Sequence, residues 1–175
     1  KLIFTFDPVN NAIFQLDTTN KETKVVSQSS QGIGYFRTAT AIPAEKSILF
    51  STDTPGLAIF DTQRNNLLKQ EVKFPEGFGS VKAVGLFGSR LYLLSTDKKM
   101  IYGFSKTLAG YEGGNSWLTD TKVPVERSVG MGVDGYIYLL LDDGTIVKML
   151  KGKQVEFKQQ KPTKPITNPT RLMIY

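Results

Sequence analysis

The feature that most constrains this chain is an internal repeat of about 45 residues. Short apolar runs that end in aspartate recur along the sequence: LIFTFD at 2–7, ILFSTD at 48–53, YLLSTD at 92–97 and IYLLLD at 137–142. Their terminal aspartates are separated by 46, 44 and 45 residues. A second apolar run follows each aspartate with separations of 44, 44 and 45 residues, measured at Ile13, Leu57, Ile101 and Ile146. Because two independent sets of positions share one period, the chain is built from repeated structural units.

Each unit is predicted to consist of β-strands. The runs are rich in β-branched and aromatic residues and are bounded by Gly, Pro, Asn and Asp, whereas no stretch has a sustained apolar stripe of helical period. Two-residue hairpin turns are predicted at Gly88-Ser89 and Asp134-Gly135. The best-defined unit is predicted as strands at 127–133, 136–142, 145–150 and 154–158. Four antiparallel strands in about 45 residues form the blade of a β-propeller, so the sequence predicts an all-β propeller with four blade units.

The chain is predicted to be a single domain, 1–175, that begins at the second strand of a blade. It ends in RLMIY, which has the pattern of a first strand, so the two ends together complete one blade. The expected blades are 1–30 plus 166–175, 35–73, 80–122 and 126–160. Two arrangements stay open: a closed ring of four blades, favoured because unpaired strand edges are a liability, or a part of a larger propeller.

The segment 106–120 departs from the period. It is rich in glycine and carries the only tryptophan of the chain, Trp117. Its place after a third strand predicts an enlarged loop between the third and fourth strands of that blade. Such a loop is either a surface insertion whose tryptophan packs on its own blade or a binding loop on a rigid scaffold.

Composition excludes many kinds of chemistry. The chain has no Cys and no His, which rules out Ser-His-Asp and Cys-His triads, thiolate or imidazole metal sites, and disulfides. The sequence shows no glycine-rich phosphate loop, no nucleophile elbow and no apolar run long enough to span a membrane. Aromatic residues occupy strand positions, which favours a core role over nucleic-acid stacking. We therefore expect no catalytic residue, metal, cofactor, nucleic-acid partner or transmembrane segment.

A second periodic set consists of cations that open the first strand of each blade. The set is spaced by 45, 45 and 44 residues and comprises Arg37, Lys82, Arg127 and Arg171. In a propeller these starts share one face with the turns that carry Asp53, Asp97 and Asp142, so the sequence predicts a charged ring around the channel mouth. The alternative is structural, because Arg127 opposes Asp142 and Arg37 opposes Asp53 across their hairpins, and such cross-strand pairs stabilise a sheet. The candidate ligand is anionic or polar, since Arg binds carboxylates and phosphates through two parallel hydrogen bonds.

Two phenylalanines, Phe74 and Phe78, lie in a loop rich in Gly and Pro between two blades. They are candidates for exposed partner-binding anchors, together with Trp117. The alternative is that they pack between blades.

The stretches SRLYLLSTDKKMIYGFS, GYIYLLLDDGTIVKML and SILFSTDTPGLAIFDTQRNNLLKQEV resemble β-propeller repeats of the YVTN and quinoprotein-like type. The Trp-Asp dipeptide of WD repeats and the Gly-Lys-x-x-Trp signature of quinone-cofactor propellers are absent from the sequence. The resemblance implies a binding scaffold, often extracytoplasmic and often fused to further domains.

The expected function is a non-enzymatic binding or sensor module that presents its loops to a protein, peptide or glycan partner. Its expected location is extracytoplasmic or at the cell surface, with the cytoplasm as the alternative. One competing hypothesis is a propeller lyase or hydrolase with an Arg/Asp site at the channel mouth. Another is a structural segment of a larger propeller fused to a catalytic or membrane-anchored domain.

Overall fold

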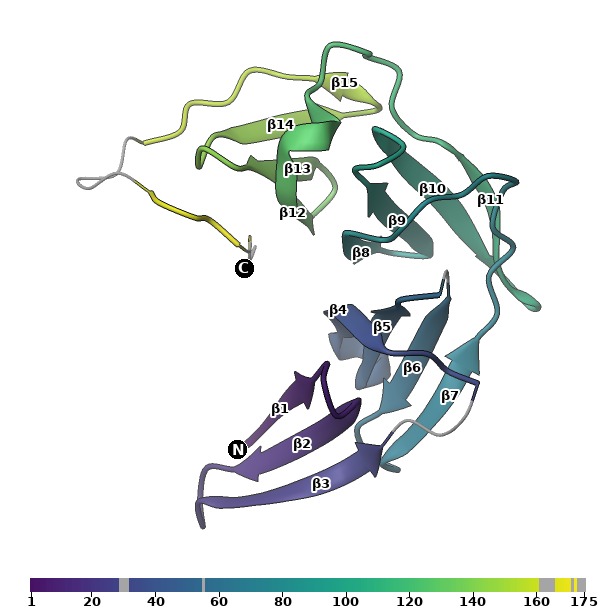
Figure 1. Ribbon diagram of the computed structural model, residues 1–175, viewed down its shortest axis with the longest axis vertical. Coiled ribbons are helices and arrows are strands. Elements are labelled where there is room, and N and C mark those ends of the chain that lie inside the picture. Colours follow the sequence, from purple (N-terminus) through teal and green to yellow (C-terminus); the bar gives the residue numbers. More distant parts are fainter. Residues whose placement is uncertain (29–31, 55, 161–165, 171, 173–175) are drawn as a thin grey trace. The chain divides into compact units, whose positions relative to one another are not determined.

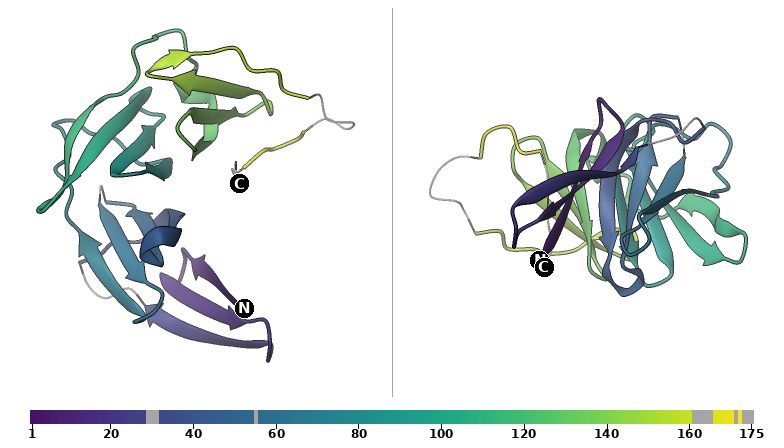
Figure 2. Two further views of the ribbon diagram at one scale, coloured as in Figure 1. Left: turned by 180° about the vertical axis from the view of Figure 1, so that it is seen from behind. Right: turned by 90° about the horizontal axis from the view of Figure 1, so that it is seen from below.

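The computed structural model describes residues 1–28, 32–54, 56–160, 166–170 and 172. Within these ranges the regular structure is β-strand, apart from two short 3-10 turns, η1 (Pro43–Glu45) and η2 (Val125–Arg127). The strands form four antiparallel sheets, and in each sheet neighbouring strands are also consecutive in the chain (Figures 1 and 2). The predicted all-β propeller with four blade units is confirmed. No helix in the described ranges is long and apolar enough to cross a membrane.

The chain divides into two compact units, Lys1–Val72 and Lys73–Tyr175. The first unit contains one sheet of three described strands and one sheet of four. The three-stranded sheet comprises β1 (Leu2–Asp7), β2 (Ala12–Asp17) and β3 (Glu22–Gln28). The four-stranded sheet comprises β4 (Phe36–Ile42), β5 (Ser47–Thr52), β6 (Leu57–Asp61) and β7 (Asn66–Gln70).

Phenylalanines form the core between the two sheets of this unit. Phe36 and Phe50 are fully buried, with ring centroids 4.5 Å apart. Phe6 of β1 meets both edge-on, at 6.3 Å from Phe36 and 5.4 Å from Phe50. Side chains alternate between the two faces of a strand, so Phe4 and Phe6 share one face of β1 and both join this core. The repeated apolar alternation in the sequence therefore becomes face-to-face packing of neighbouring blades.

The second unit contains two four-stranded sheets. One comprises β8 (Ala83–Phe87), β9 (Arg90–Ser95), β10 (Met100–Thr107) and β11 (Gly110–Ser116). The other comprises β12 (Ser128–Val133), β13 (Ile137–Leu141), β14 (Ile146–Leu150) and β15 (Lys153–Gln154).

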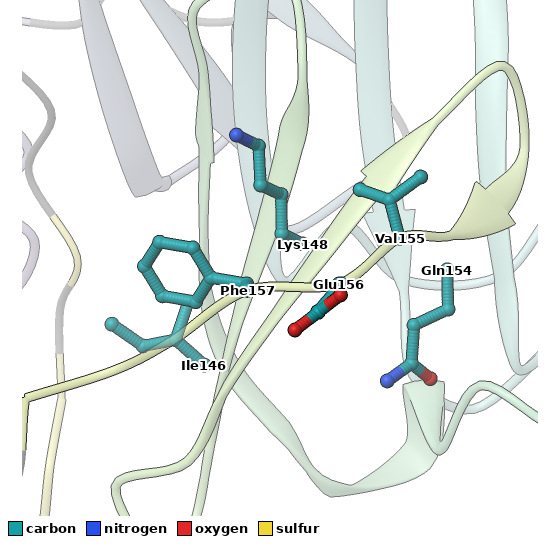
Figure 3. Close-up of a pocket in the computed structure, with 6 residues that line it drawn as sticks. All are labelled: Ile146, Lys148, Gln154, Val155, Glu156 and Phe157. Carbon is teal, nitrogen blue, oxygen red and sulfur yellow. The ribbon is translucent and has the colours of Figure 1, made fainter.

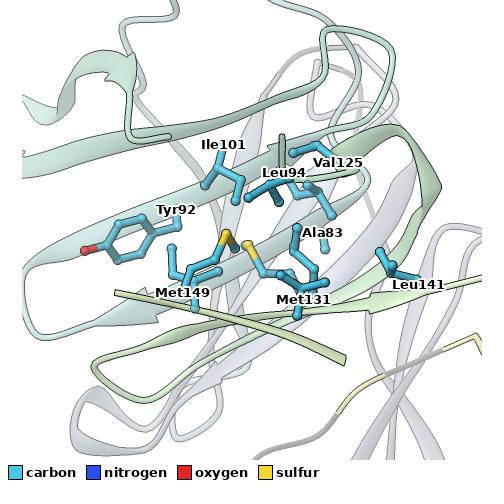
Figure 4. Packing of buried hydrophobic residues seen from close by; sticks show 12 residues of the cluster. Ala83, Tyr92, Leu94, Ile101, Val125, Met131, Leu141 and Met149 are labelled. Atoms are coloured by element: carbon cyan, nitrogen blue, oxygen red, sulfur yellow. The ribbon is translucent and has the colours of Figure 1, made fainter. Parts of the chain in front are cut away.

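The core of the second unit lies between these two sheets (Figure 4). Leu94 and Ile101 of one sheet are fully buried in a cluster with Met131 and Met149 of the other. The innermost strands β8 and β12 approach closely, and a Cβ on Gly85 would collide with the side chain of Val133. Gly85 is therefore a contact point at which only glycine fits.

The prediction of an enlarged loop over 106–120 is wrong. Residues up to Thr107 extend β10, and Gly110–Ser116 form β11, so the segment is a long hairpin whose tip is Leu108-Ala109. Its glycines indicated a loop, but Gly113 and Gly114 lie in β11 with positive φ angles of 109° and 57°, where the pairing with β10 shifts register. Glycine is the residue that tolerates such a bulge, so it accommodates an irregular strand here.

The predicted turn at Gly88-Ser89 is confirmed by the pairing of Phe87 with Arg90. Two further predictions, one of a turn and one of a strand, need correction. The turn at Asp134 has three residues, because Val133 pairs with Ile137. The strand predicted at 154–158 is reduced to Lys153–Gln154. Beyond it, the amide of Gln159 takes the place of a strand backbone, accepting from Ile146 N–H and donating to Gly144 C=O, both at 2.9 Å.

Candidate functional site

Three of the aspartates that end the second strands, Asp53, Asp97 and Asp142, act as clamps that bind the start of the first strand of their own blade. Asp53 is exposed and its carboxylate accepts hydrogen bonds from the N–H groups of Tyr35 and Thr54, both at 2.8 Å. Its own N–H donates to the Tyr35 carbonyl at 2.9 Å. The Tyr35 and Thr54 N–H groups, and then the more distant charge of Arg37, lower the pKa of the Asp53 carboxyl because they favour its ionised form.

Asp97 repeats this clamp with other donors. Its carboxylate accepts from the hydroxyl of Ser95 at 2.7 Å and from the N–H and hydroxyl of Ser80, both at 3.2 Å. These bonds, that of Ser95 first, lower the pKa of the Asp97 carboxyl. The side chain that anchors the start of this blade is therefore Ser80 and not the predicted cation Lys82.

In the fourth blade an arginine replaces the backbone donors. Arg127 donates from Nε and Nη2 to Asp142 Oδ1 at 3.1 and 2.6 Å, and from Nη2 to Asp143 Oδ2 at 2.8 Å. The predicted opposition of Arg127 and Asp142 is present. The Thr145 N–H first, and Arg127 second, lower the pKa of the Asp143 carboxyl to about 2, while the two carboxylates raise the pKa of Arg127.

The predicted cross-strand pair of Arg37 and Asp53 does not form an ion pair. Phe36 pairs with Thr52 and Thr38 pairs with Ser51, so Arg37 is the extra residue of a β-bulge. A bulged residue is displaced from its expected partner. Arg37 and Lys82 are both exposed, and in the described part of the chain neither takes part in an ion pair.

The four periodic cations thus differ in what they can do. Arg37 is the second residue of β4 in the first unit. In the second unit, Lys82 directly precedes β8 and Arg127 directly precedes β12. Arg127 is committed to two carboxylates, which leaves Arg37 and Lys82 as cations open to solvent. Arg171 lies outside the described residues.

Sequence reasoning missed the glycines that make the clamps possible. A Cβ on Gly34 would lie 2.8 Å from Asp53 Oδ1, and a Cβ on Gly79 would collide with the Asp97 carboxylate. The signal was in the sequence, because Gly34 and Gly79 are 45 residues apart, each just before a first strand.

Asn11 was also missed. Its Nδ2 donates to the Gly34 carbonyl and its Oδ1 accepts from the buried Phe36 N–H, both at 2.8 Å. This buried amide ties the β1–β2 turn to the start of β4.

The three aromatic anchor candidates all pack on side chains of the third blade, and their predicted partner-binding role stays a prediction. Phe78 lies 4.8 Å from the Tyr102 ring and 4.6 Å from Phe74, which meets Phe104 edge-on at 6.1 Å. Trp117 meets Tyr92 edge-on at 5.8 Å and packs against the core of the second unit. All three rings are half-buried, so only part of each is open to a partner.

A shallow pocket of about 500 Å³ lies at the outer edge of the fourth blade (Figure 3). It is lined by Ile146, Lys148, Gln154, Val155, Glu156 and Phe157. Lys148 and Phe157 point to one side and Gln154 and Glu156 to another, so the polar groups do not converge on a ligand. The Lys148 ammonium instead lies 3.7 Å from the centre of the Tyr136 ring, where the two side chains stabilise each other. Within the described ranges no group of three or more acidic side chains could hold a metal ion.

Comparison with known proteins places this fold among the β-propellers. No protein-family model matches the sequence, and no curated protein matches it. Solved structures do match. In the nidogen/laminin complex the similarity has a TM-score of 0.61 at 12% identity, over 89% of this chain and 58% of that chain. A chain of the mitotic checkpoint complex gives 0.57 at 7% identity over 87% and 44%, and YCF48 bound to D1 peptide gives 0.51 at 12% over 83% and 46%. The chain therefore spans about half the length of the propellers that it resembles.

Proposed function

We propose that this chain is a non-enzymatic binding scaffold that presents the loops at the starts of its first strands to a protein or peptide partner. The observation that carries the proposal is the unequal use of charge at these loops. The carboxylates there are engaged in clamps, whereas Arg37 and Lys82 stay exposed and outside ion pairs. The second and third blades therefore each offer a partner a rigid backbone and a positive side chain, which suits acidic groups.

Two kinds of observation support a binding role over the lyase or hydrolase hypothesis. A general acid needs a carboxyl whose pKa is raised toward neutrality, whereas the pKa of Asp53 and of Asp97 is lowered by hydrogen bonding. The propellers with similar folds include proteins solved in complexes, among them one bound to a peptide. A location outside the cytoplasm is part of this proposal, supported by the absence of Cys.

The test selects a phage-displayed library of random dodecapeptides on the immobilised chain and then measures binding of the selected peptides by fluorescence anisotropy. We expect the selected peptides to be rich in Asp and Glu. We also expect Arg37→Ala or Lys82→Ala to lower their affinity at least about tenfold, since truncating a charged hot-spot residue costs more than about 1 kcal/mol of binding free energy. The matched control is Arg64→Ala, which removes an exposed arginine at the opposite end of the sheet that contains Arg37. A library in which no peptides are enriched, or peptides whose affinity is the same for both variants and the native chain, would contradict the proposal.

A further inference from the structure

The backbone of Tyr35 and of its two neighbours is fixed by hydrogen bonds, although Tyr35 lies in an exposed loop. Tyr35 N–H donates to Asp53 Oδ1 at 2.8 Å, and Tyr35 C=O accepts from Asp53 N–H at 2.9 Å. The neighbouring Gly34 and Phe36 are bonded to the two ends of the Asn11 amide, each at 2.8 Å. Three successive residues are thus fixed by four hydrogen bonds from two other segments of the unit.

The side chain of Tyr35 does not share this confinement. It is 55% exposed, although the residue after it, Phe36, is fully buried in the core. Gly34, at a φ of +79°, sets the chain direction here, and any larger residue would strike Asp53 and Thr54. The equivalent clamp in the third blade, around Gly79, presents only Ser80. A rigid backbone that directs an aromatic ring outward is a preorganised contact, since binding has little loop entropy left to remove.

Two other exposed side chains belong to segments that are joined to Tyr35. Val9, 81% exposed, sits in the β1–β2 turn, which Asp7 fixes through the N–H groups of Val9 and Asn10 at 2.8 and 3.2 Å. Asn11 bonds this turn to the residues on either side of Tyr35. Arg37 follows two residues after Tyr35, at the β-bulge that frees it from the ladder. Tyr and Arg are among the residue types enriched at interface hot spots, and Val9 adds exposed apolar area.

We propose that Val9, Tyr35 and Arg37 form a peptide-binding surface for a linear segment that carries an Asp or Glu close to a large apolar side chain. The carboxylate binds the Arg37 guanidinium through two parallel hydrogen bonds. Asp53 forms no ion pair with Arg37, and its Oδ1 already accepts from the N–H groups of Tyr35 and Thr54. The apolar side chain packs on the Tyr35 ring and Val9. A nucleic acid is disfavoured because it binds through several phosphate contacts, whereas Arg37 is the one cation assigned to this surface and suits a single carboxylate. This inference rests on the proposed function and narrows it to one surface of the first unit.

The experiment measures affinity of the selected dodecapeptides for the full chain and for Val9→Ser, Tyr35→Ala and Arg37→Ala. Each altered side chain is exposed, so the variants keep the fold, which circular dichroism checks. The matched controls are Val25→Ser, which alters another exposed valine of the same unit, and Arg64→Ala. We expect at least about a tenfold loss in Tyr35→Ala and Arg37→Ala, a smaller loss in Val9→Ser and no change in the controls. A peptide whose Asp or Glu is replaced by Asn or Gln should lose the same factor on the native chain and nothing further on Arg37→Ala.

Three outcomes would overturn the inference. Peptides that depend on Lys82 and not on Tyr35 or Arg37 would keep the proposed function and place the surface elsewhere. Peptides that respond to Arg37→Ala but not to Tyr35→Ala or Val9→Ser would reduce the surface to a single charge. Tight binding of a single-stranded oligothymidylate, lost in Arg37→Ala, would assign this surface to nucleic acid.

Discussion

At the residue scale, one position of the repeat performs four different tasks. The aspartate after the second strand binds loop N–H groups in the second blade, serine hydroxyls in the third and an arginine in the fourth. In the first blade, Asp7 turns to its own hairpin and caps Val9 and Asn10. In every blade the aspartate carboxylate accepts hydrogen bonds, and each blade supplies the donors from different residues.

The clamp depends on the absence of a side chain at Gly79. We expect Gly79→Ala to lower the free energy of unfolding by about 1–3 kcal/mol, because its Cβ would collide with the Asp97 carboxylate and force it out of the clamp. Chemical denaturation followed by fluorescence of Trp117 measures the change.

Gly103→Ala is the matched control, since a Cβ there meets Trp117 at an ordinary distance of 3.6 Å. In the double variant with Asp97→Ala the two losses should be less than additive, since the collision is gone. Equal destabilisation by Gly103→Ala, or full additivity, would mean that the clamp does not explain the glycine.

At the scale of elements, the sheets are connected by side chains as well as by turns. Asn11 joins the first sheet of the first unit to the start of the second, and Gln159 completes the outer edge of β14 in the second unit. Both amides offer a donor and an acceptor together, which lets one side chain replace a backbone peptide.

Removing the Asn11 amide isolates a buried donor. We expect Asn11→Ala to destabilise the first unit by about 1–3 kcal/mol, because the N–H of the fully buried Phe36 would lose its acceptor. Hydrogen exchange at the Phe36 amide, followed by NMR, should become faster by the factor that corresponds to this loss of stability.

Asn10→Ala provides the comparison, since Asn10 is exposed and, among the residues that the structure describes, its side chain bonds only to Asp7. A loss of stability as large as that of Asn11→Ala would show that the β1–β2 turn, and not the link to β4, is what matters.

Strand positions could be predicted from the sequence because two signals agree. The alternation of side chains marks each strand, and the repeat confirms the weaker ones, as with β6 and β10. What could not be predicted depends on contacts between segments. The bulge that separates Arg37 from Asp53 adds one residue to a ladder, and nothing local to Arg37 indicates it. Likewise the glycines of β11 read as loop residues, because the strand that tolerates them is defined only by its partner β10.

At the scale of the whole molecule, the three described strands of the first sheet lack the fourth that the other sheets have. The sequence predicts that residues 166–175 complete this blade, and because Arg171 and residues 173–175 lie outside the described residues, this stays a prediction. In this arrangement the amide protons of β1 that do not bond to β2 become hydrogen-bonded. They should exchange at least about tenfold more slowly in the full chain than in a chain truncated after residue 165, since protection scales with the free energy of opening.

Analytical ultracentrifugation accompanies the exchange measurement. A monomer with protected β1 amides supports completion of the first blade by the same chain. Identical exchange with and without residues 166–175 would contradict this prediction.

The versatility of the repeat aspartate has a consequence for how such a chain can diversify. Apart from the glycine beside it in the second and third blades, a carboxylate that accepts equally from a peptide group, a hydroxyl or a guanidinium places few requirements on the loop that reaches it. Mutations can therefore change the sequence of one loop, and with it what that blade binds, while the hairpin that carries the aspartate keeps its geometry. New specificity can then arise one blade at a time, without a compensating change in the neighbouring blades.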